Sequence, residues 1–450
     1  MGDFQIAYVP VGVPTFHLES AREAFRASAD LLWDIAKKTE SSVAVPDELL
    51  LSLDKLKSFL KGVTPDVIVF QNATFANAAY MSEVLRSTSC PIILWTLREP
   101  VIDGGRLRLN SLTGAYSAAN AMCGFGRDGF PYIFGAPQEE SVKRELAAAV
   151  RAARIKWQMR DLRMASIGHT PEGFGFGRAL DLELLEGFGV TLESIEAREL
   201  IERAKGYTAE ETEDYLREAG EKMRGLDAIP EQNRIDFAKL YRAYAEYVEE
   251  HGIGALSSRC WPDFFTSFGT PVCAVLAMLN DLSIPASCEA DTYGALSMYI
   301  GAQLTGRPVF FGDPVSLDEG ENTITFWHCG TAACSLARED TGAEVGVHCN
   351  RKIGPTLDFG CRSCDNVTVF RIGRTKEGGF RFFIAEGEAL DKPKQFTGTS
   401  VVVKMQGEAR DIVTRSVKAG FEPHFCVVYG ECGLELTMLA EMLGMDVCRY

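Results

Sequence analysis

The chain has 450 residues, 62 acidic and 46 basic, and a formal net charge of −16. This length exceeds one ordinary hydrophobic core, and a composition of 46% hydrophobic and 24% charged residues is that of a globular protein, not a disordered one. The excess negative charge argues against nucleic acid or an anionic membrane as partner. The sequence has no run of 18 apolar residues, so no membrane-spanning helix is expected.

Cysteine usage and the N-terminus both indicate a cytoplasmic protein. The thirteen cysteines are odd in number and scattered, which favours reduced thiols. The N-terminal sequence MGDFQIAYVPVG has an acidic third residue and leads directly into an apolar segment, unlike a secretory signal. Cys361 and Cys364 form a C-x-x-C pair without a second pair or a thioredoxin context, so we interpret it as structural or incidental.

The first third of the chain alternates short apolar strands with helices. We predict helices over residues 20–38 and 77–87, and strands at 4–11, 66–71, 91–95 and 132–136. Continuous apolar strands separated by helices are typical of a parallel sheet covered on both faces. Ligands of such sheets collect at the carboxyl ends of the strands, which draws attention to the loops at 13–17, 72–75 and 96–100.

A dinucleotide-binding site is the obvious alternative for this region. The sequence contains G-x-G-x-x-G at Gly124, Gly126 and Gly129. This motif follows a helix-like run and precedes a strand, the reverse of the order that nucleotide binding requires. P-loop, zincin and α/β-hydrolase motifs do not occur in the sequence.

A second alternation of strands and helices begins near residue 163, and from about residue 304 the segments become short, β-rich and separated by turns. We therefore predict an α/β protein with two Rossmann-like doubly wound parallel-sheet domains, 1–163 and 164–303, followed by a β-rich C-terminal domain, 304–450.

Four polar side chains stand at the ends of apolar runs in the last two predicted domains. Glu289 precedes a predicted helix, Asp313 ends an apolar strand, His328 follows another strand, and His424 opens the strand FCVVYG. Two carboxylates and two imidazoles suit Mn²⁺, Co²⁺ or a similar divalent ion. The structural alternative is that Glu289 caps the helix, Asp313 begins a turn, and each histidine is a hydrogen-bonded core residue.

At these residues the chain resembles the L-fucose isomerase/L-arabinose isomerase superfamily of metal-dependent aldose–ketose isomerases. Glu289 in CEADTYGAL and Asp313 in VFFGD match the family's two metal-binding acids. His424 in PHFCVVYGECG matches the C-terminal ligand, and His328 falls where arabinose isomerases carry a further histidine ligand. The likeness extends over most of the chain.

The resemblance implies a reaction in which a proton moves between C2 and C1 of a sugar through a cis-enediol. A divalent metal, Mn²⁺ first, with Co²⁺ and Mg²⁺ as alternatives, would hold the sugar oxygens while Glu289 and Asp313 exchange acid and base roles. The family forms trimers or hexamers with active sites between protomers. The substrate-binding residues that it implies are Ser258, Arg259, Trp261, His348 and Arg98, the last from a neighbouring subunit.

The sugar itself is left open by the resemblance. Asp313 is of the fucose type and His328 of the arabinose type, so the substrate is either a 6-deoxyhexose or pentose, as L-fucose and D-arabinose are, or a C6-modified hexose such as sulfoquinovose. The basic cluster Asn350-Arg351-Lys352 is either an anion site for C6 or a solvated turn.

Two other classes of protein compete with the isomerase. A periplasmic-type sugar-binding protein also has two α/β lobes, but it requires an export signal and has no β-rich third domain. A metal-dependent aldolase or lyase acts on the same kind of enediolate, and its carbon–carbon cleavage products distinguish it from an isomerase.

Overall fold

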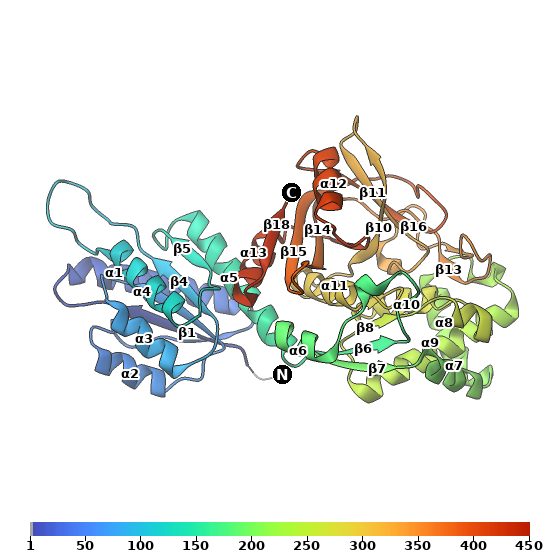
Figure 1. Cartoon of the computed structure of the whole chain (residues 1–450), viewed down its shortest axis with the longest axis horizontal. Helices are drawn as coiled ribbons and strands as arrows, with labels where there is room; N and C mark the ends of the chain where they lie inside the picture. Colours follow the sequence, from blue (N-terminus) through green and yellow to red (C-terminus); the bar gives the residue numbers. More distant parts are fainter. Residues whose placement is uncertain (1–2) are drawn as a thin grey trace. The chain divides into compact units, whose positions relative to one another are not determined.

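The computed structural model describes residues 3–450 and divides into two compact units (Figure 1). The N-terminal unit comprises the residues up to Gln158 together with Leu434–Met445, and the second unit comprises Met159–Gly433 with Asp446–Tyr450. The division into domains 1–163, 164–303 and 304–450 remains a prediction.

The N-terminal unit contains a five-stranded sheet in the order β2-β1-β3-β4-β5, and every pairing in it is parallel. Its strands are β1 (Gln5–Val11), β2 (Ser42–Ala44), β3 (Val67–Asn72), β4 (Ile92–Thr96) and β5 (Tyr132–Phe134). The strands β3 and β4 are buried along their whole length. This burial explains why the central strands have continuous apolar sequences instead of alternating ones.

Helices connect the strands of this sheet. They are α1 (Leu18–Lys38), α2 (Leu53–Lys61), α3 (Ala78–Ser87), α4 (Ser111–Gly124) and α5 (Glu140–Met159), with α13 (Gly433–Leu443) joining from the C-terminal region. Arg151 of α5 forms an ion pair with the buried Glu435 of α13. This contact fastens the C-terminal helix to the N-terminal unit.

The glycine motif at residues 124–129 serves packing in this unit. Gly124 ends α4, and a Cβ atom on Gly129 would lie 2.2 Å from the carbonyl oxygen of Glu441. Only glycine permits this approach to the C-terminal segment. The motif follows a helix and precedes β5, as the sequence indicates.

The second unit begins with a four-stranded parallel sheet in the order β7-β6-β8-β9. Its strands are β6 (Arg163–Ile167), β7 (Thr191–Ile195), β8 (Ala255–Ser258) and β9 (Ala286–Ser287). The helices of this region are α6 (Asp181–Phe188), α7 (Ala197–Gly206), α8 (Glu213–Lys222), α9 (Glu231–His251), α10 (Cys273–Asp281) and α11 (Thr292–Thr305).

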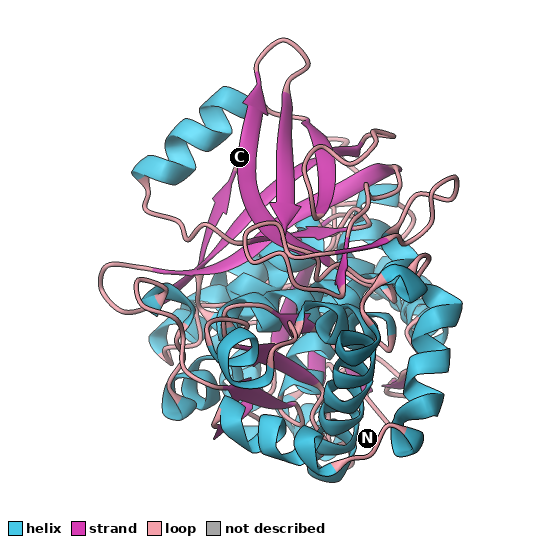
Figure 2. Cartoon of the chain, turned by 90° about the vertical axis from the view of Figure 1, so that its right-hand side faces the viewer, coloured by secondary structure: helices cyan, strands magenta, loops and turns pink. Residues whose placement is uncertain are grey.

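The β-rich part of the second unit is a seven-stranded sheet in the order β14-β17-β10-β11-β16-β15-β18, in which β14 also pairs with β15. That extra pairing closes six of the strands into a barrel-like ring, and Figure 2 shows the long strands gathered together. The strands are β10 (Phe310–Asp318), β11 (Thr323–His328), β14 (Cys364–Arg374), β15 (Phe380–Ala389), β16 (Thr399–Met405), β17 (Phe425–Val428) and β18 (Asp446–Arg449). Helix α12 (Ala409–Lys418) and the short strands β12 (Val345–Gly346) and β13 (Thr356–Leu357) complete this part.

Helix α11 joins the parallel sheet to the barrel-like sheet. Its residues 292–301 are all buried, and it packs against β8 on one side and against β14 and β17 on another. A helix that is apolar all round belongs inside a core. The residue just before α11 therefore lies deep between the two sheets.

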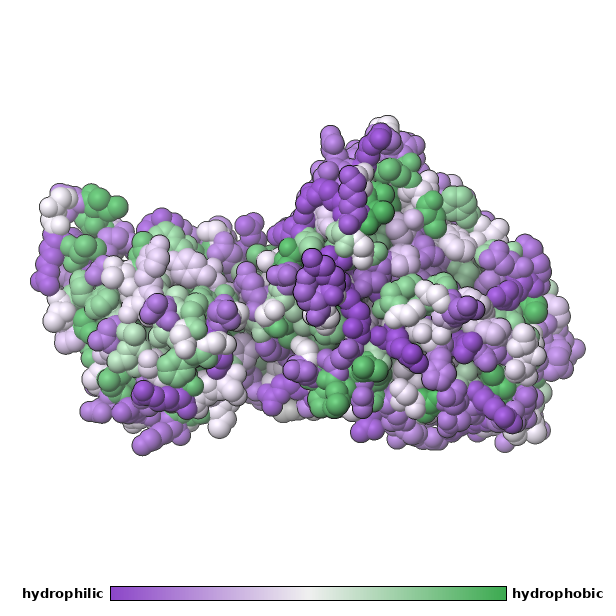
Figure 3. Space-filling model, in the orientation of Figure 1, coloured by the Kyte–Doolittle hydropathy of each residue, from purple (hydrophilic) through white to green (hydrophobic). Residues whose placement is uncertain are grey.

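The predicted fold class is confirmed at the coarser level: parallel α/β sheets followed by a β-rich C-terminal region. The finer Rossmann-like description remains a prediction. Within residues 3–450, no helix combines the length and apolarity needed to cross a membrane. On the face shown in Figure 3, hydrophilic residues predominate and hydrophobic residues form smaller groups among them.

Candidate metal centre and active site

The register of three neighbouring strands brings the predicted metal ligands together. Strand β10 pairs with β17 through Gly312 opposite Phe425, and with β11 through Asp313 opposite Trp327. Asp313 therefore lies beside the residue that precedes β17, which is His424, and beside His328 at the end of β11. Glu289 approaches the same point from the turn between β9 and α11.

Distances confirm that the four side chains form one cluster. His424 Nε2 lies 2.9 Å from Glu289 Oε2 and 3.4 Å from Asp313 Oδ1. His328 Nε2 lies 3.9 Å from the same Glu289 oxygen. Possible ligand atoms of Glu289, His328 and His424 all lie within 4.8 Å of one another. The imidazoles are buried, whereas Asp313 is 32% exposed, so the cluster is open to solvent on the side of that carboxylate.

The two carboxylates differ in pKa. Burial alone would raise the pKa of Glu289, but the hydrogen bond with His424 and the charges of the two imidazoles bring it below the ordinary value. Burial raises the pKa of Asp313 above its ordinary value despite the same two histidines. Carboxylates whose environments separate their pKa values are typical of acid–base sites.

A residue outside the predicted set, Asp291, holds His424 in position. His424 Nδ1 lies 2.9 Å from Asp291 Oδ2, and because the carboxylate only accepts, Nδ1 carries the proton and Nε2 faces the cluster. Asp291 also accepts from the Gly294 N–H as the N-cap of α11, and Arg371 donates to both of its oxygens at 2.6 and 3.2 Å. The N-cap is therefore Asp291 and not Glu289. An aspartate directly before a helix is a recognisable capping signal in the sequence.

This network is fully buried and charge-balanced. Asp291 and Arg371 are each 1% exposed. Burial alone would raise the pKa of Asp291, but Arg371 and His424 hold it well below its ordinary value. A buried carboxylate behind a ligating histidine fixes the ring's tautomer and raises its basicity.

The turn that carries Glu289 has an unusual backbone. Glu289 and Ala290 have φ values of +57° and +55°, in the left-handed region that residues other than glycine seldom adopt. The Ala290 N–H donates to the Ser258 carbonyl at 3.0 Å, and Trp261 Nε1 donates to Glu289 Oε1 at 3.2 Å. Consecutive residues in this region are concentrated at functional sites, where surrounding contacts hold them.

Aromatic rings surround His424. Ring centroids of Phe311, Phe176 and Phe174 lie 4.8, 5.4 and 6.3 Å from that of the imidazole. Phe174 and Phe176 belong to the glycine-rich loop after β6, where a Cβ atom on Gly177 would lie 2.7 Å from the Asp291 Cα. The alternation of glycine and phenylalanine in this loop is the sequence signal for a close approach of the backbone, and the two rings lie outside the predicted set of site residues.

Ser258 and Arg259, two of the predicted substrate-binding residues, support the site's backbone. The buried Ser258 hydroxyl is hydrogen-bonded to the Tyr244 hydroxyl at 2.7 Å. Arg259 Nε donates to the Trp261 carbonyl at 3.1 Å and pairs with Asp263 at 2.8 Å. Their contacts with substrate remain predictions.

Arg98 lies in the N-terminal unit. Its guanidinium forms a bidentate pair with Glu139, at 2.8 and 3.0 Å, and lies over the ring of Phe134. The side chain is 53% exposed. A role in the site of a neighbouring subunit remains a prediction.

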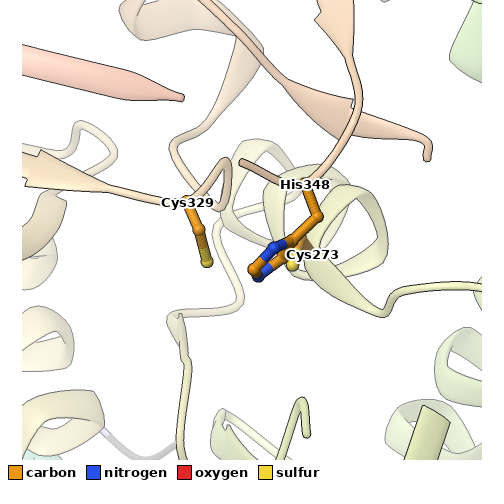
Figure 4. Close-up of side chains that lie close together, drawn as sticks. All are labelled: Cys273, Cys329 and His348. Atoms are coloured by element: carbon orange, nitrogen blue, oxygen red, sulfur yellow. The ribbon is translucent and has the colours of Figure 1, made fainter. Parts of the chain in front are cut away.

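His348 lies beside a group of thiols. Figure 4 shows its ring together with Cys273 at the start of α10 and Cys329 after β11, and possible ligand atoms of the three lie within 4.8 Å of one another. His348 Nδ1 accepts from the backbone N–H groups of Asn350 and Arg351, each at 3.3 Å. These two hydrogen bonds occupy Nδ1, and we assign no metal to this group.

Cys361 and Cys364 of the C-x-x-C pair form no disulfide, and none joins any other cysteines among residues 3–450. Cys361 is buried, and Cys364 Sγ lies 3.1 Å from the Asn366 carbonyl oxygen. The interpretation of this pair as structural or incidental stays a prediction.

The fold and the cluster define the class: an α/β protein with a buried carboxylate–imidazole centre whose nitrogen and oxygen donors fit a divalent ion such as Mn²⁺ or Co²⁺. Glu289, Asp313, His328 and His424 are the donors that fit. Because Asp291 accepts from Nδ1 of His424, Nε2 is the nitrogen that would face such an ion, in place of its hydrogen bond to Glu289.

Comparisons with known proteins identify the family. Residues 358–450 match the family model described as L-fucose isomerase, C-terminal domain. The sulfoquinovose isomerase of Clostridium sp. (strain MSTE9) is 61% identical over 450 residues, covering 100% of both chains. Those of Priestia aryabhattai and Priestia megaterium (strain ATCC 12872 / QMB1551) are each 35% identical over 454 residues, again covering 100% of both chains.

The chain therefore belongs to the L-fucose isomerase superfamily, and it is an aldose–ketose isomerase. The resemblance noted in the sequence is confirmed. A solved sugar ABC transport substrate-binding protein from Bordetella parapertussis 12822 is 12% identical, with a TM-score of 0.17 over 70% of this chain and 84% of that chain. That score is too low to support a shared fold.

Proposed function

We propose that this isomerase interconverts sulfoquinovose and its ketose by moving a proton between C2 and C1 through a cis-enediol. The reaction class follows from the family, and the choice of sugar rests on the relatives that carry this name, which match over the full length at 61% and 35% identity. The observation that carries the proposal is the convergence of Glu289, Asp313 and His424 within one cluster.

The ligands of the proposed metal are Glu289, Asp313, His424 and His328. We favour Mn²⁺, with Co²⁺ and Mg²⁺ as alternatives, because the donors are oxygen and nitrogen. The bound ion would stabilise the negative charge that develops on O1 and O2 of the sugar. Asp291 and Arg371 hold the His424 ring in the orientation that this ligand set needs.

The protein's own carboxylates carry the proton. Glu289 is held at one oxygen by the Trp261 N–H and at the other by His424, which fixes its direction of approach to the reacting carbons. Asp313 is the second carboxylate and serves as acid when Glu289 serves as base, with the roles exchanged in the reverse reaction. Phe174 and Phe176 supply an apolar wall beside these groups.

Further parts of the proposal concern assembly and location. We propose a homo-oligomer, a trimer or hexamer, in which Arg98 of a neighbouring subunit reaches the site, and we place the enzyme in the cytoplasm. Arg259, Trp261, Ser258 and His348 are the further residues that we assign to the substrate pocket or its support.

The test is conversion of a sugar panel by metal-loaded protein. Sulfoquinovose, L-fucose, D-arabinose, L-arabinose and D-ribose are incubated separately, and ketose formation is followed by proton NMR with and without EDTA. The proposal predicts conversion of sulfoquinovose that EDTA abolishes. Conversion of a different sugar only would overturn the substrate, and retro-aldol products would favour the alternative, a metal-dependent aldolase or lyase.

A further inference from the structure

Arg351 presents an exposed cation at the aromatic edge of the site. Its guanidinium carbon lies 5.5 Å from the ring centroid of Trp261 and 5.2 Å from that of Phe265. Among the described residues, 3–450, no aspartate or glutamate forms an ion pair with it. Other arginines of this unit are paired, for example Arg259 with Asp263 and Arg371 with Asp291. The charge of Arg351 is therefore available to a ligand.

The indole of Trp261 connects this cation to the metal cluster. One edge of the ring donates its Nε1–H to Glu289, and Arg351 lies over the same ring. A single side chain thus separates the charged guanidinium from the carboxylate that handles C1 and C2. This arrangement suits a substrate with its reacting carbons at one end and an anion at the other.

The backbone around Arg351 is held in place. His348 Nδ1 accepts from the N–H groups of Asn350 and Arg351, and the Lys352 N–H donates to the His348 carbonyl at 2.8 Å. The buried His348 ring also packs edge-on against Phe265, with centroids 5.1 Å apart. These contacts define the direction in which the turn presents Arg351, and they give His348 a supporting role.

We propose that Arg351 binds the anionic group on C6 of the sugar and thereby selects sulfoquinovose over uncharged sugars. This inference rests on the proposed function and deepens it. A planar guanidinium matches the oxygens of a tetrahedral anion with two parallel hydrogen bonds, and stacking on aromatic faces leaves its N–H edges free. Lys352, the next residue, makes no cation–π contact among the described residues and serves as the matched control.

The experiment measures kcat and KM for wild type, Arg351→Gln, Arg351→Lys and Lys352→Gln. The substrates are sulfoquinovose, 6-deoxy-D-glucose, which lacks the sulfonate, and glucose 6-phosphate, which carries a different C6 anion. For Arg351→Gln, KM for sulfoquinovose should rise about 10- to 100-fold, which corresponds to about 1.4–2.7 kcal/mol and matches the loss of a charge-assisted hydrogen bond. Its kcat should change far less, because the reacting carbons lie at the other end of the sugar.

Several outcomes support the inference together. Arg351→Lys retains part of the affinity, Lys352→Gln behaves as wild type, and the KM for 6-deoxy-D-glucose is unchanged by Arg351→Gln. A parallel rise in KM for glucose 6-phosphate shows general recognition of C6 anions, whereas no turnover of that sugar shows selection of the sulfonate.

The opposite results separate this inference from the proposed function. If wild type converts sulfoquinovose and Arg351→Gln keeps the same KM, the inference fails while the proposed function stands. A loss that is equal for charged and uncharged sugars would also overturn it, because a general structural role would then explain the effect. If wild type does not convert sulfoquinovose, both fail.

Discussion

Asp291 Oδ2 and His424 Nδ1 are 2.9 Å apart in a fully buried contact, and that contact joins two parts of the chain that are 133 residues apart. The same carboxylate accepts a hydrogen bond from Arg371, and it caps the N-terminus of α11. The position of the histidine is thus set by a helix terminus and a strand of the barrel-like sheet together. The orientation of the candidate metal centre depends on the packing of α11 between the two sheets.

This contact predicts that Asp291→Asn weakens metal binding about 10- to 100-fold. An amide has a similar shape but no charge, so His424 loses its fixed tautomer and Arg371 its counter-charge. Metal affinity is measured by competition with a chromophoric chelator, and circular dichroism checks that the variant is folded. Glu183→Gln, which removes the partner of Arg374 in the same unit, is the control. An unchanged affinity in folded Asp291→Asn would contradict the assigned role.

Trp261→Phe separates the two functions of the indole. Phenylalanine keeps an aromatic face for Arg351 but cannot donate to Glu289 Oε1. We expect kcat to fall about tenfold, as a hydrogen bond to a charged group is lost, and KM for sulfoquinovose to change little. Steady-state kinetics measure kcat and KM separately. A rise in KM with unchanged kcat would contradict the role assigned to the Trp261 N–H.

His424 and His328 are predicted to contribute unequally to metal binding. His424 Nε2 lies 2.9 Å from Glu289, whereas His328 Nε2 lies 3.9 Å away. His424→Gln should therefore abolish stoichiometric Mn²⁺ binding, and His328→Gln should weaken it while leaving measurable binding. Metal content after gel filtration, determined by mass spectrometry, tests this order. Full metal content in His424→Gln would show that the ion is bound elsewhere.

Acid should destabilise the packing of α7 against α9. The side chain of Glu246 is 25% exposed. It forms ion pairs with Arg203 at 2.6 Å and with Arg242 at 2.7 Å. Burial alone would raise its pKa, but hydrogen bonds from Tyr207, Arg242 and Arg203 lower it from 4.5 to about 2. A lowered pKa stabilises the folded protein above pH 4.5, and this stabilisation is lost as the pH falls from 4.5 towards 2.

Urea unfolding at pH 7 and at pH 3 tests this prediction. Glu246→Gln should lower the free energy of unfolding at pH 7 by roughly 1–2 kcal/mol and have less effect at low pH. Glu249→Gln, an exposed change on the same helix, should have little effect at either pH. If Glu246→Gln lowers the free energy of unfolding equally at both pH values, the charge of Glu246 does not contribute to stability.

The fold was predictable where local pattern and burial agree. The strands β3 and β4 are buried along their whole length and begin with continuous apolar runs, and the sequence indicates them clearly. Helix α11 appears as an apolar run, but its place between two sheets depends on long-range pairings that no local pattern encodes. The same is true of the ring closure between β14 and β15.

The candidate site was predictable where polar side chains stand at the ends of apolar runs. These positions and the family resemblance together indicate Glu289, Asp313, His328 and His424, and strand register brings them into one cluster. Their binding of a metal stays a prediction. Asp291 and Arg371 were not found, because their contact joins residues 80 apart in sequence. The basic cluster at residues 350–352 was recognisable in the sequence as an anion site or a solvated turn, and the contacts with Trp261 and Phe265 single out Arg351 within it.

The most direct test of the central claim is exchange of the C2 proton of sulfoquinovose in D₂O, followed by NMR for metal-loaded wild type and metal-loaded Glu289→Gln. The account predicts that wild type forms the ketose and that its C2 proton signal disappears. In Glu289→Gln with saturating Mn²⁺, the rates of ketose formation and of C2 proton exchange should both fall by at least about a hundredfold, the scale of general acid–base catalysis. Asp313→Asn should show a similar loss. Wild-type rates in Glu289→Gln, or no exchange by wild type that demonstrably holds its metal, would contradict the account.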